Sequence, residues 1–209
     1  MEIPNNIKYI IKRILKSEDR WKALYMATWG YSYQIKAQFE KTEFWEKIMV
    51  FGLPASKNKQ QHTYKPEELY LILTSRDGEF TIGHLQTLFS LFEELLNETS
   101  KILFNFELDT GRWKNMKEFF NQDYTKDILG GKDINELELA KETRNCFIHN
   151  GSKINGRWLD AHRNARGIST AILGDELQRG LSNVFHQIEN WNELIVNVTK
   201  KVEQKIIQK

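Results

Sequence analysis

The spacing of apolar residues constrains the fold of this chain most. Over long stretches of its 209 residues they recur every three to four positions, which is the period of an α-helix and not of a β-strand. Only three prolines occur, so few positions forbid a continuous helix. Hydrophobic residues make up 40% of the chain and charged residues 28%, which is enough apolar material for a core. We therefore predict an all-α fold.

Two predicted helices carry an unbroken apolar face. One follows a turn at Asp77 and Gly78, and the other begins near Asp175. The residues that we expect to be buried are Leu85, Leu88, Phe89, Phe92, Leu95 and Leu96 in the first helix, and Leu181, Val184, Phe185, Ile188, Trp191, Ile195, Val198 and Val202 in the second.

The rest of the chain gives weaker signals, and we expect a single helical domain over residues 1–209. Its main part would span about 66–205, with two helices in residues 5–50 as an N-terminal extension that Gly30 breaks or kinks. The other predicted segments are an exposed loop over 51–65, a helix from Pro66 to about Thr74, a short helix over 114–121 and an irregular stretch over 152–174.

Charge and cysteine content exclude several classes of protein. The net charge is +2, from 30 cationic and 28 anionic residues, so the chain lacks the strong field of a protein that coats nucleic acid. Cys146 is the only cysteine, which excludes an internal disulfide and a cysteine-based zinc site, as expected in the cytoplasm. No run of about 18 apolar residues predicts a membrane span. The histidines His62, His84, His162 and His186 lack the spacing of metal ligands, and we treat them as structural, with no metal or cofactor expected.

A further helix is predicted to begin at Asp133, which lies three residues before Glu136 as in a capping box. It would end near His149, because Asn150 and Gly151 supply the left-handed residue that commonly stops a helix. One polar stripe of this helix consists of Glu138, Glu142, Asn145 and His149, with Arg144 at the opposite margin of Ile148.

Arg144, Asn145 and His149 are the candidate catalytic residues. Cleavage of an RNA phosphodiester needs a base for the 2′-hydroxyl proton and a group that stabilises charge on the phosphate. An imidazole titrates near neutrality and can accept the proton. A guanidinium can stabilise the phosphate, and an asparagine can orient a phosphate oxygen or the ring.

The run from Arg144 to His149, followed by Asn150 and Gly151, resembles the signature of the HEPN superfamily: arginine, four to six residues beginning with a polar one, then histidine. The resemblance implies a HEPN-like helical bundle and a homodimer with both motifs in one cleft. It also implies a metal-independent endoribonuclease of a toxin–antitoxin or phage-defence system, with RNA as substrate and an antitoxin protein as a partner. His149 would be the general base, Arg144 the phosphate binder and Asn145 a positioning group. A subgroup of the family carries a nucleotide-accepting tyrosine where this chain has Gly151, so that form of control is not expected.

Other interpretations stay open. Arginine and histidine have a similar spacing at Arg157 and His162 and at Arg179 and His186, although neither arginine is followed by a polar residue like Asn145. A HEPN-type module that binds RNA or a nucleotide without cutting it would carry the same motif. A helical interaction protein would also fit the pattern.

A local cationic excess runs from Lys153 to Arg166 and is either an RNA-binding segment or a solvated loop. Trp158 within it would stack on a base or anchor the loop, and the second is favoured. Glu142 would orient His149 or, as we favour, pair with Lys141 or Lys153 in solvent. The candidate RNA-binding residues are Lys153, Arg157, Trp158, Arg163 and Arg166.

Overall fold

The computed structural model describes residues 2–23, 49–52, 61–64, 79–177 and 184–209. The chain divides into two units: Met1–Trp21 with Glu79–Lys209, and Lys22–Gly78. The first, which we call the helical unit, contains helices α1, α4, α5, α6, α7 and α9. Helices dominate the described chain, and this confirms the predicted all-α class.

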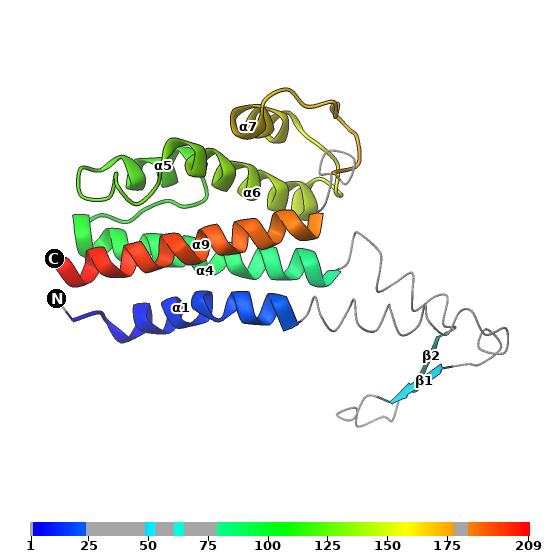
Figure 1. Cartoon of the computed structure of the whole chain (residues 1–209), viewed down its shortest axis with the longest axis horizontal. Helices are drawn as coiled ribbons and strands as arrows, with labels where there is room; N and C mark the ends of the chain where they lie inside the picture. The colour runs from blue at the N-terminus through cyan, green and yellow to red at the C-terminus, as the bar shows by residue number, and fades with distance from the viewer. Residues whose placement is uncertain (1, 24–48, 53–60, 65–78, 178–183) are drawn as a thin grey trace. The chain divides into compact units, whose positions relative to one another are not determined.

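Three helices form the core of the helical unit: α1 (Asn5–Leu15), α4 (Glu79–Phe104) and α9 (Val184–Gln208). α1 packs against both α4 and α9, which also pack against each other (Figure 1). The apolar face predicted for α4 is buried, and so are the predicted residues of α9 whose side chains the structure describes. α1 adds its own apolar face to this core, formed by Ile7, Ile10, Ile11 and Ile14.

Helices α5 (Trp113–Asn121) and α6 (Gly131–His149) lie on the other side of α4 and α9 from α1 (Figure 1). α5 confirms the short helix predicted there. α6 begins two residues earlier than predicted, after Gly130, and no side chain caps it. The expected capping box at Asp133 is therefore wrong, because Asp133 lies inside the first turn, where an acid stabilises the positive end of the helix dipole without acting as the cap.

The end of α6 is as predicted. Gly151 adopts the left-handed conformation, with φ of 55°, and the amides of Asn150 and Ser152 both donate to the carbonyl of Cys146 at 3.1 Å. The chain therefore turns directly after His149. Ser152 also has a positive φ, so the turn is tight over two residues.

Residues 152–174 are not irregular throughout, as we had expected. α7 (Gly156–Arg166) forms within them and packs on α6. The side chain of Asn155 caps it by accepting a hydrogen bond from the amide of Trp158 at 2.9 Å. The sequence hides α7 because its buried face is only Trp158, Ala161 and His162, too narrow a stripe to give a clear helical period.

The second unit contains strands β1 (Met49–Gly52) and β2 (Gln61–Tyr64), which pair antiparallel with Met49 opposite Tyr64. The loop predicted over 51–65 is wrong where these strands occur, because four-residue strands are too short to show alternation. The predicted break at Gly30, the helix from Pro66 and the turn at 77–78 lie outside the described residues.

Candidate functional site

Arg144 faces inward from α6 toward α4. Its Nη2 atom donates to Oε1 of Glu93 at 2.6 Å, and its guanidinium carbon lies 5.7 Å from the centre of the Phe89 ring. The side chain keeps 14% of its exposure, and its Nε atom is buried without a hydrogen-bond partner. Arg144 is therefore held in the contact between two helices, with little of its surface open to solvent.

The same carboxylate oxygen of Glu93 also accepts from Nζ of Lys141 at 2.5 Å. Lys141 is 3% exposed and donates in addition to the carbonyl of Thr110 at 2.8 Å. We call Glu93, Lys141 and Arg144 the Glu93 cluster. It combines two cations with one carboxylate, so it holds a net positive charge when all three are ionised.

His149 lies in the last turn of α6 and is exposed. Its ring makes no hydrogen bond or ion pair with any residue that the structure describes. Asn145, one turn earlier on the same face, is partly exposed and its side chain is likewise without a partner among the described residues.

The structure therefore brings Asn145 and His149 to one face of α6 and turns Arg144 away from them. Five residues correspond to about 140° of helix rotation, which separates the guanidinium from the ring. Arg144 and His149 therefore lie in separate surroundings within the chain, the guanidinium against Glu93 and the ring in solvent.

Trp158 cannot stack on an RNA base, because it is fully buried at 0% exposure. Its indole Nε1 donates to Oγ1 of Thr143 at 3.0 Å, and its ring packs against His162 with the centroids 4.9 Å apart. The expectation of an RNA-binding role for Trp158 is wrong, and its alternative role as an anchor is confirmed, since it fastens α7 to α6.

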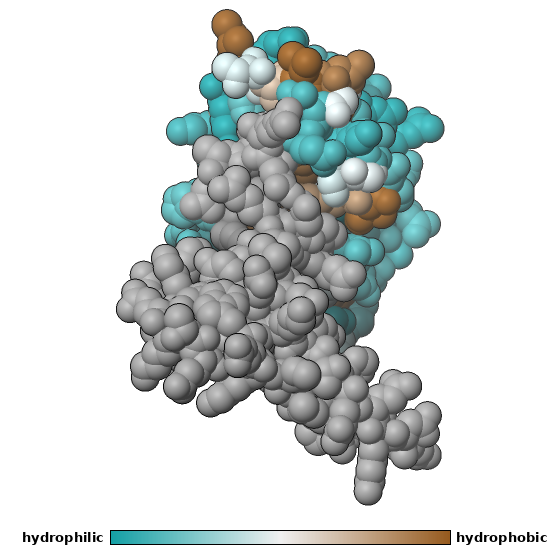
Figure 2. Space-filling model, turned by 90° about the vertical axis from the view of Figure 1, so that its right-hand side faces the viewer, coloured by the Kyte–Doolittle hydropathy of each residue, from teal (hydrophilic) through white to brown (hydrophobic). Residues whose placement is uncertain are grey.

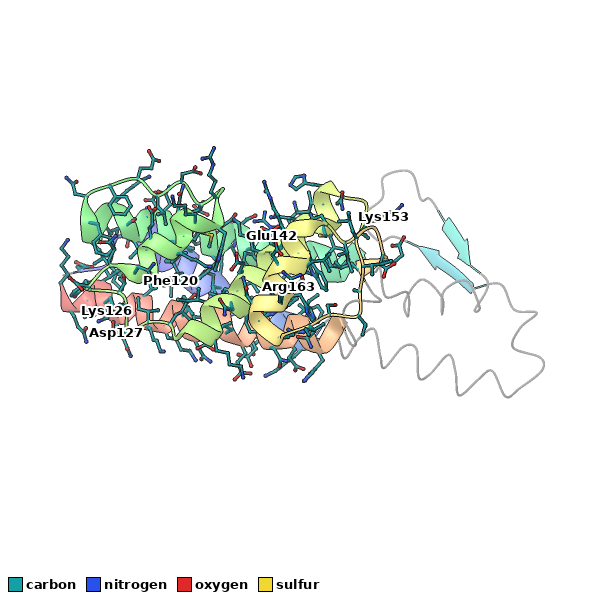
Figure 3. The ribbon with its side chains drawn as sticks, turned by 90° about the horizontal axis from the view of Figure 1, so that it is seen from above. Phe120, Lys126, Asp127, Glu142, Lys153 and Arg163 are labelled. Atoms are coloured by element: carbon teal, nitrogen blue, oxygen red, sulfur yellow. The ribbon has the colours of Figure 1, made fainter. Side chains whose placement is uncertain are left out.

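The remaining cations of the segment differ in their surroundings, and Figure 3 labels two of them, Lys153 and Arg163. Arg166 forms a two-pronged contact with Glu136, with donor–acceptor distances of 3.1 and 2.8 Å, so its charge is compensated. Arg163 on the exposed side of α7 forms a 3.2 Å pair with Asp160, which contributes little in solvent. Lys153, in the segment between α6 and α7, and Arg157 are exposed and make no ion pair with described residues. These two cations remain candidates for phosphate contact.

The expected solvent pairing of Glu142 is also wrong. Glu142 is buried, and its proposed partner Lys141 is committed to Glu93. No hydrogen bond joins Glu142 to His149 or to Lys153 among the described residues. A sequence-based search could have found Glu93, since this acid follows Phe89 by four positions and precedes Leu96 by three, at the edge of an otherwise apolar face.

The other titratable groups near the motif are structural. Burial raises the pKa of the Cys146 thiol to about 11, so this cysteine is not a nucleophile at neutral pH. Burial, together with nearby Arg166, lowers the pKa of His162, which keeps its ring neutral against Trp158. Burial likewise lowers the pKa of His84, whose Nε2 lies 3.0 Å from Oδ1 of Asn192.

Comparison of the chain with models of protein families, with curated proteins and with solved structures finds no match. The described residues contain no group of three or more histidine, cysteine or acidic side chains placed to hold a metal ion. None of the helices in the described part of the chain is both long and apolar enough to cross a membrane.

Proposed function

We propose that the protein is a metal-independent endoribonuclease of the HEPN type. The observation that carries the proposal is the state of His149: an exposed imidazole without a partner among the described residues, beside Asn145 at the end of a helix. Such a ring is free to accept a proton from a substrate. The remaining features of the site bear on how the phosphate is held.

In the proposed reaction His149 removes the 2′-hydroxyl proton, and the 2′-oxygen attacks the adjacent phosphorus. The bond to the 5′-oxygen breaks, and this oxygen takes a proton from the imidazolium or from water. The products are a 2′,3′-cyclic phosphate and a 5′-hydroxyl. Asn145 would position the ring or a phosphate oxygen.

Arg144 would stabilise the phosphorane from within the Glu93 cluster. Glu93 offsets one of the two cations and fixes the guanidinium, while buried Lys141 supplies the second positive charge. An arginine held in this way loses less rotamer entropy on binding phosphate than a free surface arginine. One terminal nitrogen of Arg144, Nη2, already donates to Glu93, so fewer of its N–H groups remain for the phosphate.

A symmetric homodimer would bring His149 of one chain toward the Arg144 side of another. Exposed apolar residues support an interface near the end of α6: Ile148 lies beside His149, and Ile168, Ile172 and Leu173 are exposed in the segment after α7. Figure 2 shows hydrophobic surface on the end of the helical unit that faces the viewer. A role in a cytoplasmic toxin–antitoxin or phage-defence system, with an antitoxin protein as partner, belongs to the same proposal.

A second candidate is a HEPN-type module that binds RNA or a nucleotide without cutting it. The pairing of Arg144 with Glu93 favours this alternative, because the carboxylate occupies part of the guanidinium that catalysis would use. The two candidates differ in whether His149 performs chemistry.

The deciding experiment incubates the purified protein with a structured RNA in EDTA and analyses the fragment ends. Cleavage that leaves cyclic phosphates and is abolished by His149→Ala supports the enzyme. His186→Ala is the matched control, because His186 is an exposed histidine of α9 that follows Arg179 by seven positions. This substitution should leave cleavage unchanged. Binding that weakens with salt but produces no fragments favours the module, and neither binding nor cleavage sinks both.

A further inference from the structure

The N-terminal segment is rich in positive charge. Residues 2–23 contain six cations, Lys8, Lys12, Arg13, Lys16, Arg20 and Lys22, and three acids, Glu2, Glu18 and Asp19, for a net charge of +3. The whole chain has a net charge of +2, so the remaining residues together carry −1. This segment therefore carries more net positive charge than the whole chain.

All of these cations except Lys22 share one side of α1 and of its continuation. At about 100° per residue, the positions from Lys8 to Lys16 that carry cations or Tyr9 fall within an arc of about 140°, opposite the buried isoleucines. The helical bonding continues beyond α1, since the amide of Arg20 donates to the carbonyl of Lys16 at 3.2 Å. We call this side the α1 basic face, formed by Lys8, Tyr9, Lys12, Arg13, Lys16 and Arg20.

Most of this charge has no partner within the described residues. Lys8 pairs with Glu2 at 3.0 Å, whereas Lys12, Lys16 and Arg20 make no ion pair there. Lys8, Lys12, Lys16 and Arg20 follow one another at four-residue spacing, and like charges so placed destabilise a helix by about 0.2–0.5 kcal/mol per pair. A bound polyanion would remove that repulsion. Some cations elsewhere in the helical unit are compensated, as in the pairs Lys117–Glu138, Arg166–Glu136 and Lys205–Asp127.

Tyr9 adds an aromatic surface in the middle of the cations. Its side chain is 62% exposed, and the guanidinium carbon of Arg13 lies 5.6 Å from the ring centre. An exposed ring flanked by cations is the arrangement on which bases of single-stranded nucleic acid stack. A membrane would need exposed apolar residues to insert, whereas Ile7, Ile10, Ile11 and Ile14 are all buried in the core.

We propose that the α1 basic face docks single-stranded RNA, with backbone phosphates along the cations and a base on Tyr9. The choice of RNA rests on the proposed function, whereas the phosphate contacts and the stacking do not. α1 lies across α4 and α9 from α6, so this surface holds RNA without taking part in the chemistry at His149 (Figure 1).

The test is binding of a fluorescent oligouridine of about 12 nucleotides, followed by anisotropy over a range of salt concentrations. His149→Ala protein in EDTA keeps the RNA intact. The variant replaces Lys12, Lys16 and Arg20 by glutamine, and its matched control replaces three exposed lysines on other helices, Lys114, Lys132 and Lys200. Both sets remove three positive charges.

We expect the α1 variant to bind the RNA at least about tenfold more weakly. The slope of log affinity against log salt concentration should become shallower by about two, since each lost phosphate contact removes about 0.7 from it. The control should change affinity by less than about twofold. Tyr9→Ala should weaken binding about fivefold or more, and Tyr9→Phe should restore it. Single substitutions, such as Lys12→Gln with a slope change of about 0.7, keep the test valid if the triple variant folds poorly.

The inference is overturned if the α1 variant binds RNA as tightly as the unchanged protein. It is also overturned if this variant loses binding to phosphatidylserine vesicles but keeps its binding to RNA. Cleavage by protein with intact His149 decides the proposed function separately. Binding that depends on α1 without any cleavage supports the docking surface and sinks the enzyme, whereas cleavage without such dependence does the reverse.

Discussion

Replacing Glu93 by glutamine tests whether the Glu93 cluster holds α4 and α6 together. The substitution keeps the shape of the side chain but removes the only carboxylate that the structure places on Lys141 and Arg144 within the described residues. Lys141 is 3% exposed and Arg144 is 14% exposed, so both cations would stay buried without an anion. The remaining amide oxygen of the glutamine can accept hydrogen bonds but cannot offset charge.

Removal of one partner from a buried ion pair costs about 3–5 kcal/mol. We expect the low end, about 3 kcal/mol, because Glu93 is itself 16% exposed and Lys141 keeps its hydrogen bond to Thr110. For a chain of this size, that loss lowers the melting temperature by about 6–12 °C. Lys141→Met should cost far less, since it removes the buried cation and leaves Glu93 paired with Arg144.

The measurement is urea unfolding followed by tryptophan fluorescence, on the two single variants and on the double variant with both changes. Glu93→Gln should cost markedly less in the Lys141→Met background, where only Arg144 loses its partner. A cost below about 1 kcal/mol for Glu93→Gln alone, or one that is equal in both backgrounds, would refute the argument that charge compensation stabilises this contact.

Three further predictions follow from buried side chains of the helical unit. Trp158→Ala should destabilise the protein by about 3–5 kcal/mol in thermal or urea unfolding, because the indole is fully buried against α6 and its hydrogen bond to Thr143 is lost; a cost typical of a surface residue would contradict this. Stability should fall as the pH drops below 6.5, because the pKa values of His84 and His162 are lowered by folding and the unfolded chain then binds more protons; His84→Gln with His162→Gln should flatten the profile of unfolding free energy against pH. Cys146 should resist iodoacetamide near neutral pH until the protein unfolds, as mass spectrometry can follow, and rapid alkylation of the folded protein would show that the thiol is accessible.

The helices that the sequence predicts well are those whose apolar residues form a wide stripe. α4 and α9 are examples. The end of α6 was predictable because Gly151 follows it, and glycine readily adopts the left-handed conformation that commonly ends a helix. α7 was missed because three buried side chains on 11 residues do not establish a period. The start of α6 was misplaced because Gly130 caps it through its backbone conformation and offers no side-chain signal.

The site was harder to predict than the fold, because a motif along one helix gives no information on what other helices bring to it. Arg144 and His149 could be named from their spacing, but the partner of Arg144 comes from α4, 51 residues earlier in the chain. Trp158 was ambiguous for the same reason, since only the tertiary packing on Thr143 buries it. The α1 basic face was missed because its cations gather on one side only when the segment is wound into a helix.

The spacing of the motif places its arginine and its histidine on different sides of α6. Five residues of α-helix correspond to about 140° of rotation and about 7.5 Å of rise, so an arginine and a histidine at this spacing cannot point the same way from one helix. In this structure Arg144 turns to α4 and His149 turns to solvent. A two-fold axis near the end of α6 would remove the conflict, because one chain could supply the imidazole and the other the positive charge of its Glu93 cluster. The separation of the two side chains within one chain is compatible with the shared site that we propose.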